Sequence, residues 1–286
     1  MPLRTRVAYA FLAPYLLIFT TFWLWPIINS FLLSFQNTRV NPWRFAPSMN
    51  WGRLIGDPAF YNALYNTLII LVIQVPVMIA LATLMAVLLN SPLLKARPLY
   101  RFAFFAPVVV GEVAYAAVFR LMFSTDFGVI NKILINIGLP PISWFDNATA
   151  AMALIIIAVT WRWAGYNAII ILAGLQSIPG DVYEAARLDR VSKRQQFFHI
   201  TLPLLKPIII FCLVLSVIGT MQLFTEPFLI TNRGGPGGGT ETLGIFLYRQ
   251  GFTALNFGYA SAIAYTIAAL AISISLFNLW FGREQK

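Results

Sequence analysis

The sequence predicts an all-α membrane protein that crosses the bilayer several times. The chain has 286 residues, of which 59% are apolar and only 10% are charged. An ordinary soluble domain has about 25% charged and about 45–50% apolar residues, so this chain has too few polar side chains to cover a water-facing surface. The 24 phenylalanines, 11 tyrosines and 8 tryptophans also exclude an intrinsically disordered chain, which would contain few aromatic residues.

The apolar residues are grouped into runs that are long enough to be transmembrane helices, since a span needs roughly 20 apolar residues. Six such runs lie near residues 8–35, 64–89, 99–123, 150–172, 204–230 and 257–281. An even number of spans places both termini on one side of the membrane. The segments on that side carry twelve basic residues and the opposite segments carry six. The positive-inside rule therefore predicts that both termini are cytoplasmic.

The composition also limits the chemistry that the chain can carry. The net charge of +10 is attributed to the positive-inside bias of the loops rather than to nucleic-acid binding. Cys212 and His199 are the only residues of their types, so no clustered Cys/His metal site is expected. The chain has no G-x-x-x-x-G-K-[ST] phosphate-binding motif and no convergent catalytic set. We therefore expect no enzymatic activity, no metal and no cofactor in this chain itself.

The most informative segment is the polar stretch at about residues 177–207, between the fourth and fifth expected spans. The charge count makes this loop cytoplasmic. In its first half, Tyr183 and Ala186 share one face of a helical segment, while Glu184 and Leu188 lie on another. Small alanines would allow a partner to approach closely. Periodicity alone equally favours a short amphipathic helix that lies on lipid headgroups.

The spacing in this loop resembles the EAA motif of permease subunits of binding-protein-dependent ATP-binding cassette (ABC) importers. The residues of the loop that carry the resemblance are Glu184, Ala185, Ala186, Asp189, Phe197, Ile200, Leu202 and Pro203. The resemblance implies a pair of short helices that docks onto a separate ATPase subunit. It also implies that Glu184 makes the main charged contact there and that Ala185 and Ala186 provide a close-packing surface.

Arg190 departs from that motif, because the family usually has glycine directly after the aspartate. Glycine would allow a positive φ at the turn between the two short helices, whereas arginine there costs roughly 1 kcal/mol or more. Either the turn is built differently, or Arg190 gains a contact with the ATPase subunit or a lipid phosphate.

The resemblance extends over almost the whole chain and indicates a MalF-type sugar permease. Segments 57–60, 231–236 and 240–243 are similar to that type. This implies a single transmembrane domain over residues 1–286 with the type I importer permease (MetI-like) fold, in a bacterial cytoplasmic (inner) membrane. The implied partners are a MalG-type second permease, two copies of an ATP-binding subunit that holds ATP and Mg²⁺, a periplasmic or extracellular sugar-binding protein, and membrane lipid. The expected function is ATP-driven import of a carbohydrate, with an oligosaccharide favoured.

Polar residues inside the fourth and fifth spans are the candidate sugar contacts, since such residues are costly in hydrocarbon. These candidates are Trp161, Arg162, Trp163, Tyr166 and Asn167, together with Ser216, Gly219, Thr220, Gln222 and Glu226. The alternative is a structural role, with Arg162 in a buried ion pair with Glu226 or Glu112 and the tryptophans as interface anchors.

Two other features leave alternatives open. The glycine-rich segment 234–239 is either an external gate or docking surface, or a plain connecting loop. For the function of the whole chain, the alternatives are an ion-coupled secondary sugar transporter and a membrane-embedded enzyme. A secondary transporter would be expected to show internal repeats and midplane carboxylates, and the sequence has no internal repeat.

Overall fold

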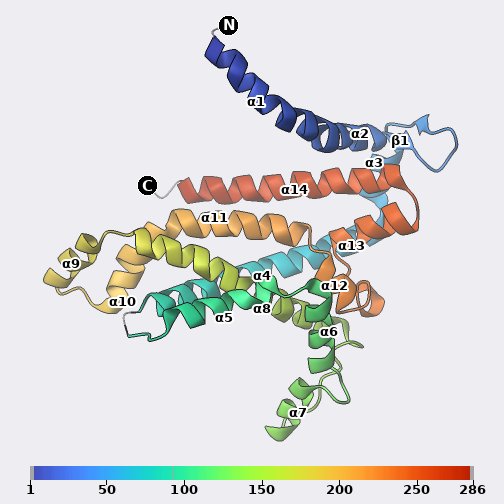
Figure 1. The fold of residues 1–286 in the computed structure, drawn as a ribbon. Helices are drawn as coiled ribbons and strands as arrows, with labels where there is room; N and C mark the ends of the chain where they lie inside the picture. Colours follow the sequence, from blue (N-terminus) through green and yellow to red (C-terminus); the bar gives the residue numbers. More distant parts are fainter. Residues whose placement is uncertain (1–2, 92, 284–286) are drawn as a thin grey trace. The chain divides into compact units, whose positions relative to one another are not determined.

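The computed structural model describes residues 3–91 and 93–283, with side chains described for residues 9–91 and 93–282 (Figure 1). The first half contains α1 (Leu3–Phe19), the π-helical segment η1 (Thr20–Leu24), α2 (Trp25–Leu33), β1 (Gln36–Asn37), β2 (Arg44–Phe45), α3 (Met49–Gly56), α4 (Pro58–Asn90), α5 (Arg97–Val109), α6 (Glu112–Met122) and α7 (Val129–Asn136). The second half contains α8 (Ala148–Ser177), α9 (Gly180–Leu188), α10 (Lys193–Gln196), η2 (Phe197–Thr201), α11 (Leu202–Met221), α12 (Thr225–Leu229), η3 (Pro236–Gly238), α13 (Leu243–Tyr248), η4 (Arg249–Thr253) and α14 (Phe257–Arg283). The prediction of an all-α protein is confirmed, since the two strands form only a short antiparallel pair.

Five of the predicted spans are single helical segments long and apolar enough to cross a membrane: Tyr9–Leu33, Pro58–Asn90, Ala148–Ser177, Lys193–Leu229 and Phe257–Gly282. Pro14, Pro76 and Pro207 lie inside helices that continue past them. The cytoplasmic placement of both termini stays a prediction from charge. Some of the basic residues that support this prediction are not fully described by the structure. Lys286 lies outside the described residues, and only the backbone is described for Arg4, Arg6 and Arg283.

The third predicted span, 99–123, is wrong as a single continuous helix. It consists of α5 and α6, which meet at an angle of 97°. Val110 has ψ 131° and Gly111 has ψ 138°, so both residues are extended and separate the two helices. Pro107 lies in the last turn of α5, where its missing N–H and its ring weaken the helix. The two helices together can still make one broken span.

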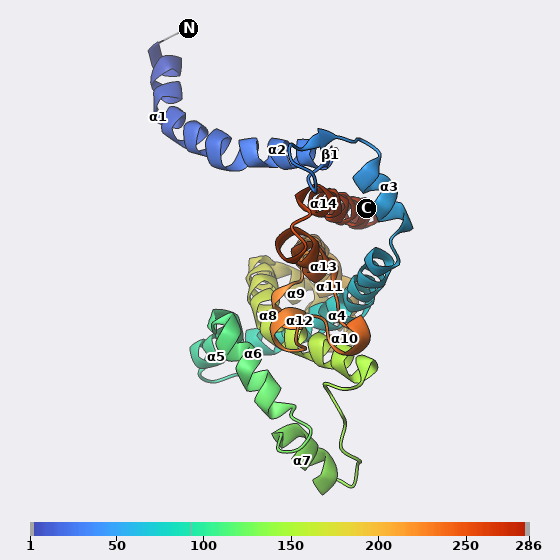
Figure 2. The same cartoon turned by 90° about the vertical axis from the view of Figure 1, so that its right-hand side faces the viewer.

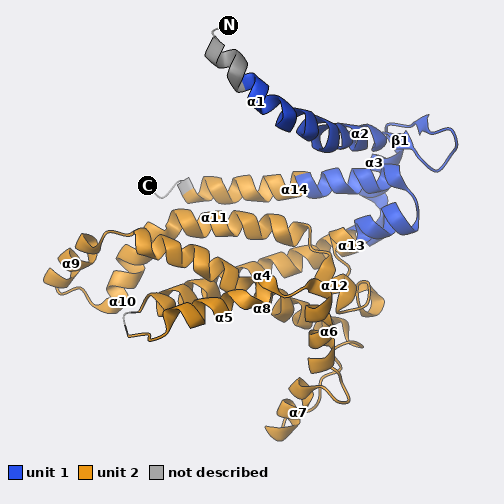
Figure 3. Ribbon diagram, viewed as in Figure 1, with its two compact units in different colours: residues 1–60, 246–268 blue, residues 61–245, 269–286 orange. Residues whose placement is uncertain are grey.

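The chain divides into two compact units (Figure 3): Met1–Phe60 with Phe246–Ala268, and Tyr61–Ile245 with Ala269–Lys286. In the first unit, Asp57 accepts a 2.8 Å hydrogen bond from the hydroxyl of Tyr259. The guanidinium of Arg53 lies over the Tyr259 ring, 4.0 Å from its centroid. The amide of Asn50 donates to the carbonyls of Ser34 and Gln36. These contacts join α3 to the start of α14 and to the end of α2.

The second unit has a core between α4, α8 and α11. Met78 and Ala82 of α4, Ala168 and Ile171 of α8, and Leu205 of α11 are buried in it. Helices α5 and α8 also pack closely, because a Cβ added at Gly165 would overlap the backbone carbonyl of Phe104. Small residues that let helix backbones approach are typical of membrane helix interfaces. Both Figure 1 and Figure 2 show α7 projecting from the rest of this unit.

The glycine-rich segment is attached to α4 by hydrogen bonds. The amides of Asn62 and Asn66 both donate to the carbonyl of Gly238, and Thr231 and Thr240 are linked by a 2.6 Å hydrogen bond. Gly234 has φ 114°, a conformation that side chains rarely adopt. The segment is therefore a hydrogen-bonded turn, while its role as a gate or docking surface stays a prediction.

Candidate functional site

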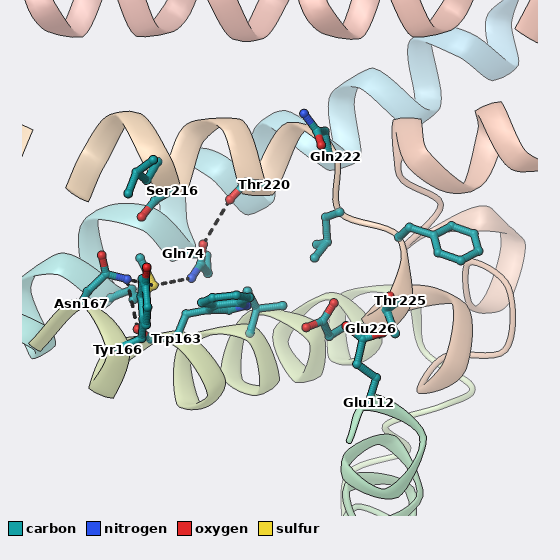
Figure 4. A pocket seen from close by; sticks show the side chains of 16 residues that line it. Gln74, Glu112, Trp163, Tyr166, Asn167, Ser216, Thr220, Gln222, Thr225 and Glu226 are labelled. Atoms are coloured by element: carbon teal, nitrogen blue, oxygen red, sulfur yellow. Dashed lines mark hydrogen bonds between the residues drawn. The ribbon is translucent and has the colours of Figure 1, made fainter. Parts of the chain in front are cut away.

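A cavity of about 360 Å³ lies among α4, α6, α8, α11 and α12, and all of its lining residues belong to the second unit (Figure 4). The side chains around it are mixed, with aromatic rings, amides, hydroxyls and carboxylates among apolar groups. Its lining consists of Gln74, Met78, Glu112, Val159, Trp163, Tyr166, Asn167, Leu215, Ser216, Gly219, Thr220, Gln222, Leu223, Phe224, Thr225 and Glu226. Apolar walls with a few placed polar groups are typical of small-molecule sites, so this cavity can hold a ligand that has both apolar and polar groups.

Hydrogen bonds of polar side chains run both between and within the helices that line the cavity. Thr220 of α11 donates a 3.5 Å hydrogen bond to the amide oxygen of Gln74 in α4. The Gln74 amide nitrogen donates to the sulfur of Met78 at 3.2 Å. Asn167 of α8 donates to the carbonyl of Trp163 at 3.0 Å. Trp163 and Tyr166 meet edge to face, with 5.7 Å between their ring centroids.

Charged groups lie at the end of the cavity formed by α6 and α12. An Nη2–Oε1 distance of 3.7 Å joins Arg162 of α8 to Glu112 of α6. The guanidinium of Arg162 also lies 5.0 Å from the centroid of the Tyr115 ring. Glu226 of α12 is 6% exposed and lines the same cavity. Figure 4 shows Glu112 and Glu226 on neighbouring sides of this end.

The structure brings together eight of the ten residues that the sequence suggests as sugar contacts. Those eight are Trp163, Tyr166, Asn167, Ser216, Gly219, Thr220, Gln222 and Glu226. Trp161 is not among the lining residues and stacks on the Tyr115 ring, with 5.7 Å between the centroids. Arg162 is not among them either, and it forms the ion pair with Glu112 that was its structural alternative. Contact with a sugar stays a prediction for all ten.

Four polar or soft side chains of the cavity, Gln74, Met78, Glu112 and Thr225, were not among the ten candidate sugar contacts. Gln74 is an amide in the middle of the apolar run of α4, and Glu112 is the one carboxylate in the run 99–123. Each therefore carried the signal that was used for the other spans, namely a polar group that is costly in hydrocarbon. Met78 carried no such signal, because methionine is common in any apolar helix.

The loop at about residues 177–207 forms two short helices, α9 and α10, and the second continues through η2 into α11. Figure 1 shows α9 and α10 extending beyond the ends of α8 and α11. Ser192 and Gln195 form a capping box that starts α10. The hydroxyls of Tyr183 and Thr201 are 3.0 Å apart, which ties α9 to η2. The pair of short helices implied by the EAA resemblance is therefore present.

The residues of the EAA-like motif differ in exposure. Glu184, Ala185, Asp189, Arg190 and Pro203 are exposed, Phe197 and Leu202 are half-buried, and Ala186 is buried. Of the two alanines, Ala185 therefore lies on the open surface of α9, while Ala186 packs within the chain. The Glu184 side chain is 70% exposed and its Oε1 lies 3.7 Å from Nη2 of Arg187. The roles of these residues in a partner contact stay predictions.

Arg190 has φ 55°, so the turn keeps the left-handed conformation that glycine would favour. The amide of Val191 donates to the carbonyl of Ala186, and the amide of Arg190 donates to that of Arg187. This pair of bonds is a Schellman motif, whose left-handed residue is usually glycine. The turn is therefore not built differently, and arginine occupies the strained position.

We expect Arg190→Gly to stabilise the permease by about 1 kcal/mol, because it removes the strain of a left-handed non-glycine residue. Differential scanning calorimetry of the purified complex measures this as a rise in Tm. Arg187→Gly is the matched control, since it places glycine inside α9 and should lower Tm. A lower Tm for Arg190→Gly would show that the Arg190 side chain makes a stabilising contact that outweighs the strain.

Spans with a polar cavity between them and a pair of short helices outside them are the features expected of a membrane transport subunit. The family model described as "Binding-protein-dependent transport system inner membrane component" matches residues 51–284. The chain belongs to this family and is thus a multi-pass inner-membrane permease component with the type I (MetI-like) fold. Membership in this family favours the function of an ABC importer permease over those of an ion-coupled transporter or a membrane-embedded enzyme.

Individual relatives are similar over nearly the whole chain. The lactose transport system permease protein LacF of Rhizobium radiobacter is 41% identical, covering 96% of this chain and 94% of LacF. The trehalose/maltose transport system permease protein MalF of Thermococcus litoralis is 30% identical, covering 99% and 96%. A chain from a crystal structure of a bacterial alginate ABC transporter in complex with an alginate pentasaccharide-bound periplasmic protein matches with a TM-score of 0.85. It is 23% identical, and the match covers 98% of this chain and 95% of that chain.

Proposed function

We propose that this chain is the MalF-type permease subunit of an ABC importer and that its cavity passes a carbohydrate, with an oligosaccharide favoured. The observation that carries the proposal is the cavity itself. Rings of Trp163 and Tyr166 stand beside amide, hydroxyl and carboxylate groups in one transmembrane space. Aromatic faces pack on the C–H surfaces of sugar rings, and the polar groups bind ring hydroxyls. The names of the relatives, which include lactose and trehalose/maltose systems, support the same substrate class.

The proposal assigns energy coupling to other polypeptides. ATP and Mg²⁺ would be held by two copies of an ATP-binding subunit, and this chain would have no ATPase site of its own. A MalG-type permease would complete the transmembrane pathway, and an external sugar-binding protein would deliver the substrate. The exposed side chain of Glu184 on α9 would make the main charged contact with an ATP-binding subunit.

The helix path supports a direct mechanical link from the coupling loop to the cavity. The segment Lys193–Leu229 is one helical span that begins in the loop and carries Ser216 and Thr220 in the cavity wall. A movement of the loop would therefore displace the wall of the sugar site. Closure of the ATP-binding subunits can drive such a change only if ATP binds the two states of the transporter with different affinities.

The test is lactose-stimulated ATP hydrolysis and lactose uptake in proteoliposomes that contain the complex purified through this chain. We expect an ATPase subunit to co-purify and ATP to be required for uptake. Uptake under an ion gradient without a co-purified ATPase would contradict the proposal. A panel that also contains maltose and trehalose separates the choice of sugar from the class of transporter.

We expect Trp163→Ala to weaken lactose binding to the complex by about tenfold, which corresponds to about 1.4 kcal/mol, because the variant removes an aromatic wall of the cavity. Trp161→Ala is the matched control, since Trp161 belongs to the same helix but does not line the cavity. Isothermal titration calorimetry measures both. Equal losses in the two variants would show that Trp163 acts through the fold rather than through the sugar.

A further inference from the structure

We propose that the cavity selects uncharged sugars and rejects acidic ones, such as uronates and sugar phosphates, through the carboxylates of Glu112 and Glu226. This inference rests on the sugar-import function proposed above. It adds a substrate class that is defined by charge. Three observations carry it: the charges that line the cavity, the position of Arg162, and the hydrogen-bonding capacity of the remaining walls.

The charged groups on the walls of the cavity are all acidic in the described part of the chain. Glu112 and Glu226 line it, and no lysine, arginine or histidine of the described residues does. Glu112 comes from the start of α6 and Glu226 from α12, so the two carboxylates approach the cavity from different elements. A ligand at this end meets both.

Arg162 pairs with the lining residue Glu112 but does not itself line the cavity. Its side chain is 8% exposed, and Nη2 lies 3.7 Å from Oε1 of Glu112. The other terminal nitrogen, Nη1, is fully buried and has no hydrogen-bond partner among the described groups. An anionic ligand in the cavity therefore cannot form the two-pronged contact by which arginine usually binds a carboxylate. Arg162 pairs with Glu112, so when Glu226 is ionised its charge has no ion-pair partner among the described residues.

The two carboxylates differ in how strongly water screens them, since the Glu112 side chain is 56% exposed. Glu226 is 6% exposed, and charges interact more strongly in a buried environment than in bulk water. A second anion in the cavity would be repelled by the unbalanced carboxylate and would lose its own hydration.

A neutral sugar, in contrast, fits the hydrogen-bonding groups that are present. An ionised carboxylate only accepts hydrogen bonds, and sugar hydroxyls can donate to Glu112 and Glu226. The Gln74 amide gives one N–H to the sulfur of Met78 and can donate the other to a sugar oxygen. The Ser216 hydroxyl donates to the carbonyl of Cys212 and can accept a hydrogen bond from a sugar hydroxyl, and both side chains line the cavity. A carboxylate on the sugar has only acceptor atoms and would place them against acceptors of the protein.

The experiment compares two disaccharides that differ only at the C6 carbons, α-1,4-galactobiose and α-1,4-digalacturonate. Isothermal titration calorimetry measures their binding to the purified complex without the external binding protein, so that only the transmembrane site is tested. We expect galactobiose to bind at least about tenfold more tightly, which corresponds to about 1.4 kcal/mol. We expect Glu226→Gln, which keeps the shape of the side chain, to bring the two affinities within about threefold of each other.

Asp126→Asn is the matched control, because it also removes one carboxylate but lies on the exposed surface before α7. It should keep the preference of the wild type. Equal binding of both disaccharides by the wild type overturns the charge selection and leaves the sugar function intact. An unchanged preference in a folded Glu226→Gln complex overturns the role of Glu226. No binding of galactobiose, lactose or maltose overturns the sugar site itself, and the charge selection with it.

Discussion

Replacing Glu184 by alanine is expected to reduce lactose-stimulated ATP hydrolysis by at least about tenfold, which corresponds to about 1.4 kcal/mol of lost coupling. The permease itself should stay folded. The Glu184 side chain is 70% exposed, and the ion pair that the structure gives it joins it to Arg187 on the same short helix. Exposed pairs of this kind contribute about 0–1 kcal/mol to stability. A large functional loss would therefore arise from a contact outside this chain.

Two measurements separate loss of contact from loss of fold. The amount of ATPase subunit that co-purifies with Glu184→Ala should fall, while the Tm of the permease stays within about 2 °C of the wild type. Asp126→Ala, an exposed carboxylate away from the coupling loop, should change neither quantity. Wild-type ATP hydrolysis and co-purification in Glu184→Ala would contradict the assignment of α9 as the contact helix.

Replacing Gly165 by valine is expected to have the largest effect on stability. Even a Cβ at this position would overlap the backbone carbonyl of Phe104, so α5 would have to move away from α8. Overpacking of a close contact typically costs 1–3 kcal/mol, and more where the backbone must shift. We expect a marked fall in Tm and in the yield of assembled complex, measured by calorimetry and size-exclusion chromatography.

Gly219→Ala is the matched control for steric overlap. Gly219 also lies inside a membrane helix, but a Cβ there has nothing within 4 Å. Alanine is favoured over glycine in a helix by about 0.8–1.0 kcal/mol, so this variant should be as stable as the wild type or more so. If Gly165→Val kept the wild-type Tm, α5 and α8 would not be packed as closely as the structure indicates.

The lengths of the apolar runs were sufficient to predict the spans, because hydrocarbon thickness fixes how many apolar residues a helix needs. The break between α5 and α6 could not be predicted in this way. Residues 99–123 are apolar on both sides of the break, and Pro107 is no reliable signal, since Pro76 and Pro207 lie inside helices that continue. The extended backbone of Val110 and Gly111 becomes visible only in the structure.

The candidate site could be predicted in part for a related reason. Trp163 and Thr220 were suggested because polar or amphipathic groups in a span are costly, and the structure places both at one cavity. Which neighbouring residue faces that cavity depends on the rotation of each helix. Trp161 and Arg162 therefore do not line the cavity, although they directly precede Trp163 in the sequence. The EAA-like spacing correctly indicated two short helices, but it could not show that Arg190 adopts the glycine-like conformation.

The 97° bend between α5 and α6 also has a consequence for the lipid around this chain. The two arms have 13 and 11 residues, which at about 1.5 Å per residue is well short of a hydrocarbon layer about 30 Å thick. Where they meet, the last carbonyls of one arm and the first amides of the other have no helical partners. Acyl chains cannot satisfy these groups, so water or protein must do so. Wherever the bend lies within the hydrocarbon, acyl chains alone therefore cannot cover it, and water or a protein neighbour has to contact it.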